Sequence, residues 1–425
     1  MSGNPQWLRL DNTANVYTAS RKKNWASLFR FSGTLTEPVD PEILQQAVYR
    51  TTARFPSFSM RLRRGVFWHY LQRIEGGPPV VPDGCCPCEP LRPEDNRGFY
   101  FRVMYYNCRI SVDFFHALTD GTGALSFLKT LLAEYLTLRY GLDVPRDSVI
   151  LDCGSEPAPE EYEDSFQRYA GAAARVRYVK RSFRIRGTRE PDGYINVTCG
   201  IIPLDEVLKR SREKGATLTQ YLAAVLMMSL AEIQRREARI ETLRKPITLL
   251  IPVNLRNHFP SLTKRNFTGM VYPYIETRLG EHDFDEVLSA VKHYMGSEVT
   301  PRLLRARFTS FVNSQRHPVL RYIPLFLKNP ILRVVQRYAG DRKSCITFSN
   351  LGECALPPEM TPYVQNCEVI MGPLRVNPTC LLMSYAGKLY INMARSIEEP
   401  KVEREFFTNL VKLGIPVKIE SNMRR

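Results

Sequence analysis

The sequence lacks the two apolar signatures that would carry the chain into or across a membrane. Residues 1–30 contain no apolar segment of the kind found at the centre of a secretory signal. No window reaches the length of ~18 uninterrupted apolar residues that a transmembrane helix needs. We therefore expect a cytoplasmic chain with no transmembrane segment. In that compartment its ten cysteines are expected to stay reduced.

Common catalytic loops are also missing. The chain has neither the Gly-x-Ser-x-Gly elbow of a serine hydrolase nor a phosphate-binding loop of the Walker type. Gly121-Thr-Gly123 lies between a strand-like and a helix-like run, as a dinucleotide fingerprint would, but the third position is Ser126. No acid that ends a second parallel strand follows about 20 residues later. We predict that no cofactor is bound permanently.

One cysteine cluster has the spacing of a metal or redox site. Cys85-Cys86-Pro87-Cys88 contains a C-x-x-C pair. A zinc site of this kind needs a second such pair or paired histidines, and neither is present. The cluster also lies in a stretch rich in Pro and Gly, whereas a redox pair of this type opens a helix. We therefore predict no metal site.

The chain has a large excess of basic residues. Its 59 Lys and Arg outnumber 43 Asp and Glu, for a formal net charge of +16. Such a charge favours anionic partners: nucleic acid, an acidic membrane surface, a phosphorylated co-substrate or an acidic carrier protein. The basic residues are scattered, with no recognisable nucleic-acid-binding motif or interleaved aromatics, so we predict no specific nucleic-acid partner.

Residues 317–338 form the most apolar stretch that also carries several basic residues. Pro324 and Pro330 interrupt it. A basic pair of helices that seeks the membrane interface would have this composition, which leaves room for peripheral membrane contact. A packed pair of surface helices has the same pattern and is the simpler interpretation.

Strand-like and helix-like runs alternate along the whole chain. The first part has strand patterns at 25–35, 61–74, 99–106 and 109–115, and helix patterns that begin at Asp40-Pro41-Glu42 and at 121. A connector with blocks of charge and several prolines covers 141–192. The second part has strand patterns at 195–202, 246–254, 346–348, 368–370, 379–385 and 388–394, and helix patterns at 204–214, 220–236, 284–294 and 401–413. We predict an α/β protein of two halves, 1–180 and 181–425, each with a mostly antiparallel sheet flanked by helices.

The segment 110–135 contains the most informative histidine. A run of β-branched and aromatic residues ends at Phe115, and a helical pattern begins at 121. His116 lies between them, and it is the only one of the six histidines at such a switch with an acid, Asp120, four residues later. A strand end holds a side chain rigidly, which favours catalysis, but a packed core histidine would have the same spacing.

A resemblance to a known family goes beyond that spacing. His116-Ala-Leu-Thr-Asp120-Gly121 resembles the His-x-x-x-Asp-Gly motif of the chloramphenicol acetyltransferase-like superfamily, which includes condensation domains, plant acyl-CoA acyltransferases and alcohol acetyltransferases. Condensation domains usually have a second histidine where this chain has Phe115. Three further stretches are similar to family segments and follow in the same order: Leu28 to Leu35, Pro252-Val-Asn-Leu-Arg256 and Ser349-Asn-Leu-Gly352. The Asp-Phe-Gly-Trp-Gly motif of the plant enzymes is missing.

The resemblance implies a reaction and roles for individual residues. The active site would lie between the two halves, with His116 as the general base that moves an acyl group from a thioester to a hydroxyl. Asp120 would be structural and pair with Arg256, and Gly121 would allow close backbone passage. Ser349 or Asn350 would stabilise the oxyanion or contact substrate.

The donor and the acceptor stay open at this stage. We expect acyl-CoA as co-substrate, an alcohol in preference to an amine as acceptor, and a monomeric enzyme. One alternative is a condensation enzyme that acts in trans on an acyl carrier protein. Another is a relative that binds an acyl or peptide ligand without turnover.

Overall fold

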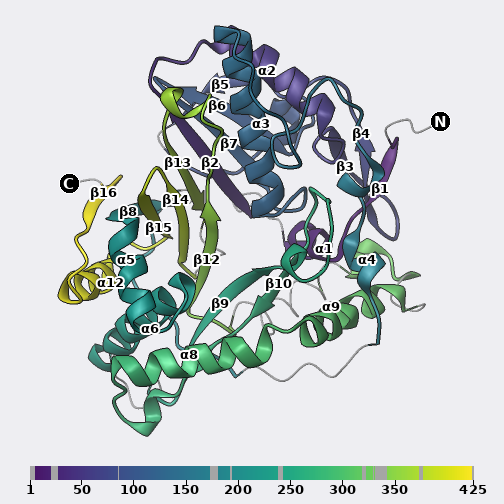
Figure 1. The fold of residues 1–425 in the computed structure, drawn as a ribbon. Helices are drawn as coiled ribbons and strands as arrows, with labels where there is room; N and C mark the ends of the chain where they lie inside the picture. The colour runs from purple at the N-terminus through teal and green to yellow at the C-terminus, as the bar shows by residue number, and fades with distance from the viewer. Residues whose placement is uncertain are drawn as a thin grey trace.

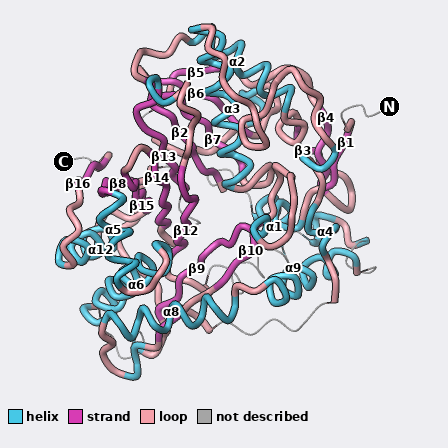
Figure 2. Tube along the Cα trace, viewed as in Figure 1, coloured by secondary structure: helices cyan, strands magenta, loops and turns pink. Residues whose placement is uncertain are grey.

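The computed structural model describes residues 5–20, 27–84, 86–172, 180–191, 194–237, 243–317, 322–328, 330, 342–372 and 377–423. Cys85 of the C-x-x-C cluster therefore lies outside the described residues. So do 173–179 of the connector and most of the basic apolar segment, namely 318–321, 329 and 331–338. The described strands form three sheets, and helices pack on them (Figures 1 and 2).

The first half is built on a five-stranded sheet with the order β13-β2-β7-β6-β5. These strands are β2 (Leu28–Leu35), β5 (Val80–Pro82), β6 (Phe101–Tyr106), β7 (Arg109–Phe115) and β13 (Val364–Met371). Helices α2 (Pro41–Arg54) and α3 (Gly121–Tyr140) pack side by side on this sheet (Figure 1). The core between them is rich in phenylalanine, because the inward positions of β2, β6 and β7 carry aromatic side chains.

The second half is built on a larger sheet with the order β10-β9-β12-β14-β15-β8-β16, to which β11 adds beside β9. The strands are β8 (Asn196–Pro203), β9 (Ile247–Asn254), β10 (Thr268–Val271), β11 (Tyr274–Ile275), β12 (Ile346–Glu353), β14 (Thr379–Tyr385), β15 (Lys388–Arg395) and β16 (Lys418–Ser421). The helices that pack on this sheet are α5 (Leu204–Glu213), α6 (Leu218–Arg236), α8 (Phe284–Glu298) and α12 (Lys401–Lys412). Most strand pairs are antiparallel; β12 runs parallel to β9 and β14, and β5 runs parallel to β6. The expected α/β class with mostly antiparallel sheets is confirmed.

A third, small sheet lies at the edge of the first half. It has the order β1-β4-β3, from β1 (Trp7–Arg9), β3 (Met60–Arg64) and β4 (His69–Arg73). Helix α1 (Asn12–Ser20) follows β1 directly. Below it, α4 (Ser165–Tyr169) packs against α9 (Pro301–Arg316) through a cluster of phenylalanines (Figure 1).

Strand β13 ties the two halves together. By residue number it belongs to the second half, yet it pairs antiparallel with β2 of the first sheet, with Val369 opposite Phe31. The chain leaves the second sheet at the end of β12, adds this strand to the first sheet, and returns as β14 (Figure 1). The boundary at 180/181 stays a prediction, and pairing in the sheets crosses it.

Local interactions of the sequence mark the starts of three helices. Asp40 caps α2 through bonds from the Glu42 and Ile43 amides, as the Asp-Pro-Glu pattern predicts. Thr217 and Asp283 each form a capping box, at the starts of α6 and α8.

Among the described residues, no single helix is long and apolar enough to cross a bilayer. Only α5 and α6 taken together, which meet at 87°, reach that length and composition.

Candidate active site

The turn from β7 to α3 fixes the position of His116. The backbone N–H of His116 donates to the carbonyl oxygen of Ser27, just before β2, at 2.9 Å. Four residues further on, the Asp120 carboxylate caps α3 by accepting from the Gly123 amide at 3.1 Å. A strand, the segment just before β2 and a capped helix therefore hold the short loop that carries the histidine.

Two aromatic rings cover the imidazole of His116. Tyr17 of α1 stacks on it, with ring centroids 4.4 Å apart and planes at 19°. Phe29 of β2 packs against it at 4.7 Å and 55°. The residue is half-buried, and its Nδ1 atom is buried with no hydrogen-bond partner among the described residues. The accessible part of His116 is therefore away from Nδ1.

This environment sets the protonation state of the histidine. Burial lowers the pKa of His116 below its ordinary value of 6.5, because the charged imidazolium loses hydration. The Asp120 carboxylate and nearby polar groups such as Asn266 act in the opposite direction, but burial outweighs them. At neutral pH the imidazole is uncharged and able to accept a proton.

Asp120 is engaged by other groups. Its Oδ2 accepts three bonds, from Arg256 Nη1 at 2.8 Å, from the Phe267 amide at 2.8 Å and from Thr268 Oγ1 at 3.0 Å. Burial alone would raise the pKa of Asp120, which is only 2% exposed, but the Arg256 charge and these hydrogen bonds lower it. The carboxylate is therefore ionised and saturated by structural partners, and it has no capacity left for proton transfer.

Arg256 reaches across from the second half to form this ion pair. It lies in a short turn just after β9, and its contact with Asp120 is through one nitrogen, so the pair is not bidentate as such pairs often are. Its Nε and Nη2 donate instead to the carbonyl oxygens of Thr263 and Arg265, at 2.6–3.1 Å. One arginine thus fixes both the helix cap of the first half and a loop of the second.

The two glycines at the start of α3 have different neighbours. A Cβ on Gly121 would lie 2.5 Å from Cδ2 of Leu351 in β12. A Cβ on Gly123 would overlap the carbonyl oxygen of Lys264 and the hydroxyl of Thr119. Gly121 therefore permits close approach of a side chain from the second half, whereas Gly123 permits close approach of its backbone.

Ser349 and Asn350 lie on β12, two residues and one residue before Leu351, and thus near the same helix start. Asn350 is held in place on both sides of its amide. Its Nδ2 donates to Thr219 Oγ1 at 3.0 Å, and its Oδ1 accepts from the Gly352 amide at 2.9 Å. Ser349 pairs in register with Leu381 of β14. The roles of both residues at the site stay predictions.

The segment 264–268 is part of the site that the sequence did not indicate. Its Lys264 carbonyl accepts from Thr119 Oγ1 at 2.6 Å, and Asn266 Nδ2 donates to the His116 carbonyl at 3.1 Å. The same Asn266 amide lies 3.4 Å from Asp11, which accepts from the Ala14 amide at the start of α1. This segment therefore joins the His116 turn, the Asp120 carboxylate and the helix that carries Tyr17. Its sequence has no recognisable motif, so only the structure identifies it.

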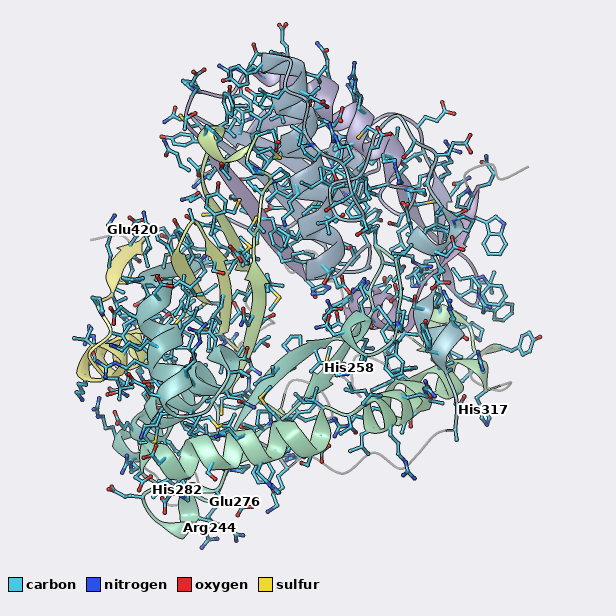
Figure 3. All side chains as sticks on the ribbon, in the orientation of Figure 1. Arg244, His258, Glu276, His282, His317 and Glu420 are labelled. Atoms are coloured by element: carbon cyan, nitrogen blue, oxygen red, sulfur yellow. The ribbon has the colours of Figure 1, made fainter. Side chains whose placement is uncertain are left out.

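The other histidines of the described chain are elsewhere. Figure 3 shows His282 and His317 near opposite ends of the α8–α9 layer, and His258 beside the β9–β10 pair. Burial, together with Arg64 and Lys328, lowers the pKa of His69 in β4 to about 4. Among the described residues no group of three or more His, Cys, Asp or Glu is arranged to hold a metal ion.

Solved structures share this architecture over nearly the whole chain. Polyketide synthase associated protein 5 from Mycobacterium tuberculosis superposes with a TM-score of 0.65 at 16% identity, and the match covers 97% of this chain and 99% of that one. TRI101 from F. sporotrichioides, crystallised with coenzyme A and T-2, gives 0.62 at 11% identity, with coverage of 97% and 99%. The first condensation domain of the CDA synthetase gives 0.60 at 16% identity, with coverage of 96% of each chain. The chain therefore has the fold of the chloramphenicol acetyltransferase-like superfamily of condensation domains and acyltransferases.

Comparisons of sequence alone give no such match. No protein-family model matches the chain. No curated protein matches it at a significant level.

Proposed function

We propose that this protein is an acyltransferase that moves an acyl group from acyl-CoA to the hydroxyl of an acceptor alcohol. One observation carries the proposal: within a single turn, burial keeps His116 uncharged while the neighbouring Asp120 is saturated by structural partners. His116 is thus an uncharged base beside a carboxylate that does not compete with it for the proton of the acceptor hydroxyl. That is the arrangement a general base needs at neutral pH.

The reaction follows from what a neutral imidazole does. As the acceptor oxygen attacks the thioester carbonyl, a C–O bond forms and the hydroxyl proton passes to His116. The resulting tetrahedral oxyanion needs a hydrogen-bond donor, and we assign Ser349 to that role in preference to Asn350, whose Nδ2 already donates to Thr219. The C–S bond then breaks, His116 returns its proton to the leaving thiolate, and the enzyme regains its starting state without a covalent intermediate.

The structural neighbours support acyl-CoA as the donor. The TRI101 structures from two Fusarium species contain coenzyme A together with T-2, so the shared fold accommodates coenzyme A beside a second ligand. The excess of basic residues suits the phosphates of coenzyme A as well. Condensation domains have the same fold, so an acyl carrier protein is the alternative donor that an experiment must separate from CoA.

The test is a transfer assay with the purified protein. Acyl-CoAs of increasing chain length are offered with a panel of alcohols, and the ester product is detected by mass spectrometry, because the protein's own thiols would disturb a thiol-release readout. We expect ester formation with at least one acyl-CoA and a loss of about 10²–10⁴-fold in kcat for His116→Ala. Turnover only with an acyl carrier protein would show that the donor is the carrier. An unchanged rate in His116→Ala would show that the proposed mechanism is wrong.

A further inference from the structure

The small sheet at the edge of the first half has an apolar face and a basic face. Leu8, Leu62 and Leu71 point inward and pack on the core. The strand register places Trp7, Gln72 and Arg61 in one row on the opposite face, and Arg9, Tyr70 and Arg63 in the next. The Nε atoms of Arg61 and Arg63 both donate to Oε1 of Gln72, which confirms that these side chains share a face.

An apolar tip extends this basic face. The turn between β3 and β4 exposes Val66 (67%) and Trp68 (43%). The segment 322–328 packs beside it, since the Leu325 amide donates to the Val66 carbonyl at 2.9 Å, and it exposes Phe326 (64%) and Leu327. Large apolar side chains exposed side by side are uncommon on a surface that faces only water.

Three basic residues of this region lack an ion-pair partner among the described residues. Arg63 and Arg64 form no ion pair with any described carboxylate, and neither does Lys328, whose Nζ donates to the Phe67 carbonyl at 3.0 Å. The charges of Arg64 and Lys328 contribute to the low pKa of His69 between them. The tip is thus apolar at its end and positive around its base.

We propose that this basic-aromatic surface, formed by Arg61, Arg63, Val66, Trp68, Phe326 and Leu327, docks on an anionic lipid bilayer. Tryptophan and other amphipathic side chains favour the boundary between headgroups and acyl chains, and arginines beside them are attracted to anionic headgroups. The apolar side chains are spread over the tip of a hairpin and a neighbouring helical segment, 325–328. Such a tip can insert into a bilayer without a preformed complementary surface, whereas a protein partner would need a matching hollow.

The surface is connected closely to the candidate active site. The chain passes from β1 into α1 within three residues, and Tyr17 of α1 stacks on His116. The docking itself does not depend on the proposed acyl transfer and can be tested without it.

Binding to vesicles is the direct test. Full-length protein is mixed with vesicles of phosphatidylcholine alone or with phosphatidylglycerol added, and co-sedimentation is measured at low and high salt. We expect binding only with phosphatidylglycerol, weaker at high salt. Arg61→Gln with Arg63→Gln should weaken it by about 25-fold, about fivefold for each basic side chain near the surface. Trp68→Ser and Phe326→Ser should each weaken it too, and brominated lipid should quench tryptophan fluorescence in the wild type but less in Trp68→Ser.

Matched variants on the far side of the molecule provide the controls. Val411 is 57% exposed and Arg404 is exposed on α12, which lies on the opposite side of the protein from β1 and β4 (Figure 1). Val411→Ser and Arg404→Gln should bind vesicles as the wild type does, and circular dichroism should show that all variants are folded. The proposal is overturned if the wild type ignores anionic vesicles. It is also overturned if the α12 variants lose as much binding as the tip variants, or if the surface binds an acidic carrier protein while the vesicles do not.

Discussion

His116 and Asp120 show how two titratable groups in one turn acquire opposite roles. Both are in a region of low hydration, which by itself favours the neutral form of each. Asp120 receives four hydrogen bonds, one of them from the charged Arg256, so it stays charged. His116 receives two aromatic rings instead, so it stays neutral. The difference between a structural acid and a candidate base therefore depends on their neighbours, and the residue types alone do not determine it.

The pH dependence of transfer should reflect this lowered pKa. The active form is the neutral imidazole. Because burial lowers the pKa of His116, half of this form is lost only at a pH below the ordinary 6.5. We expect kcat/KM to stay constant as the pH falls through 6.5 and to decline only in more acidic buffer. Tyr17→Ala should remove one covering ring and move the decline to higher pH, whereas Tyr17→Phe should leave it in place. A wild-type decline centred at or above 6.5 would contradict the burial argument.

Removal of the Asp120 charge should affect stability more than chemistry. Asp120→Asn leaves Arg256 buried without its anion, and such a loss costs about 3–5 kcal/mol. The pKa of Asp120 is lowered in the fold, so its contribution is complete above the unfolded value of ~3.9 and is lost as the pH falls through the lower folded value. Urea unfolding should show the full difference between wild type and variant at pH 7 and a smaller one in strong acid. As a control, Asp285→Asn removes an exposed pair with Lys214 and should cost only about 0–1 kcal/mol.

At the scale of elements, the start of α3 is packed against the second half at two points of unequal stiffness. The neighbour of Gly121 is the end of a leucine side chain, which can turn aside. The neighbour of Gly123 is the backbone of Lys264, held by a hydrogen bond from Thr119. The helix can therefore tolerate a new methyl group at the first position and not at the second.

Alanine substitution at each glycine measures this difference. Gly123→Ala should lower the free energy of unfolding by about 1–3 kcal/mol or more, since it forces the two halves apart. Gly121→Ala should be close to neutral, because the leucine moves and alanine gains up to ~1 kcal/mol of helix propensity over glycine. Thermal and urea unfolding of both variants give the comparison. Equal losses at both positions would show that the Lys264 backbone is not the limiting contact.

The sequence predicted those elements whose signals are local. Asp40, Thr217 and Asp283 are caps that bond to amides two or three residues away, so nearby residues suffice to identify them. The His-x-x-x-Asp-Gly turn was recognised for the same reason. Helix α1 was not expected, since it is largely polar and is held by Asp11 and by its contact with His116.

Other parts could not be predicted because they depend on contacts between distant residues. Asn266 approaches His116 only after both halves have formed, across 150 positions of sequence. Helix α9 did carry a local signal, Thr300 as N-cap before Pro301, but its many arginines obscured the apolar positions. The sequence of neither strand indicates the pairing of β13 with β2, because each has the pattern of an ordinary strand of its own half.

At the scale of the whole molecule, this pairing means that neither half is complete alone. The first sheet needs Val364–Met371, which lie far beyond the predicted boundary at 180. Residues 1–180 expressed alone should be largely insoluble, because the edge of β2 would be open to association with other copies. Co-expression with 181–425 should return both pieces to the soluble fraction as a complex.

A fragment to which the missing strand is added tests whether the open edge of β2, and not the general loss of the interface between the halves, makes 1–180 insoluble. Residues 1–180 joined by a flexible linker to 360–372 should be more soluble than 1–180 alone, although the second sheet is still missing. Gel filtration of the three preparations provides the measurement. If 1–180 alone were a soluble monomer with cooperative unfolding, the strand would not be required.

The same pairing has a consequence for the time at which the protein can finish folding in the cell. Strands β2, β6 and β7 and helices α2 and α3 are all made by Tyr140, but the strand that closes their sheet ends at Met371. At ~5–20 residues per second, the ribosome needs about 10–50 s to cover that distance. Throughout that interval the nascent chain carries a sheet with an aromatic core and an unpaired edge at β2. We therefore expect newly made protein, more than mature protein, to depend on chaperones, and a synonymous change that slows translation between 140 and 371 to lower its yield.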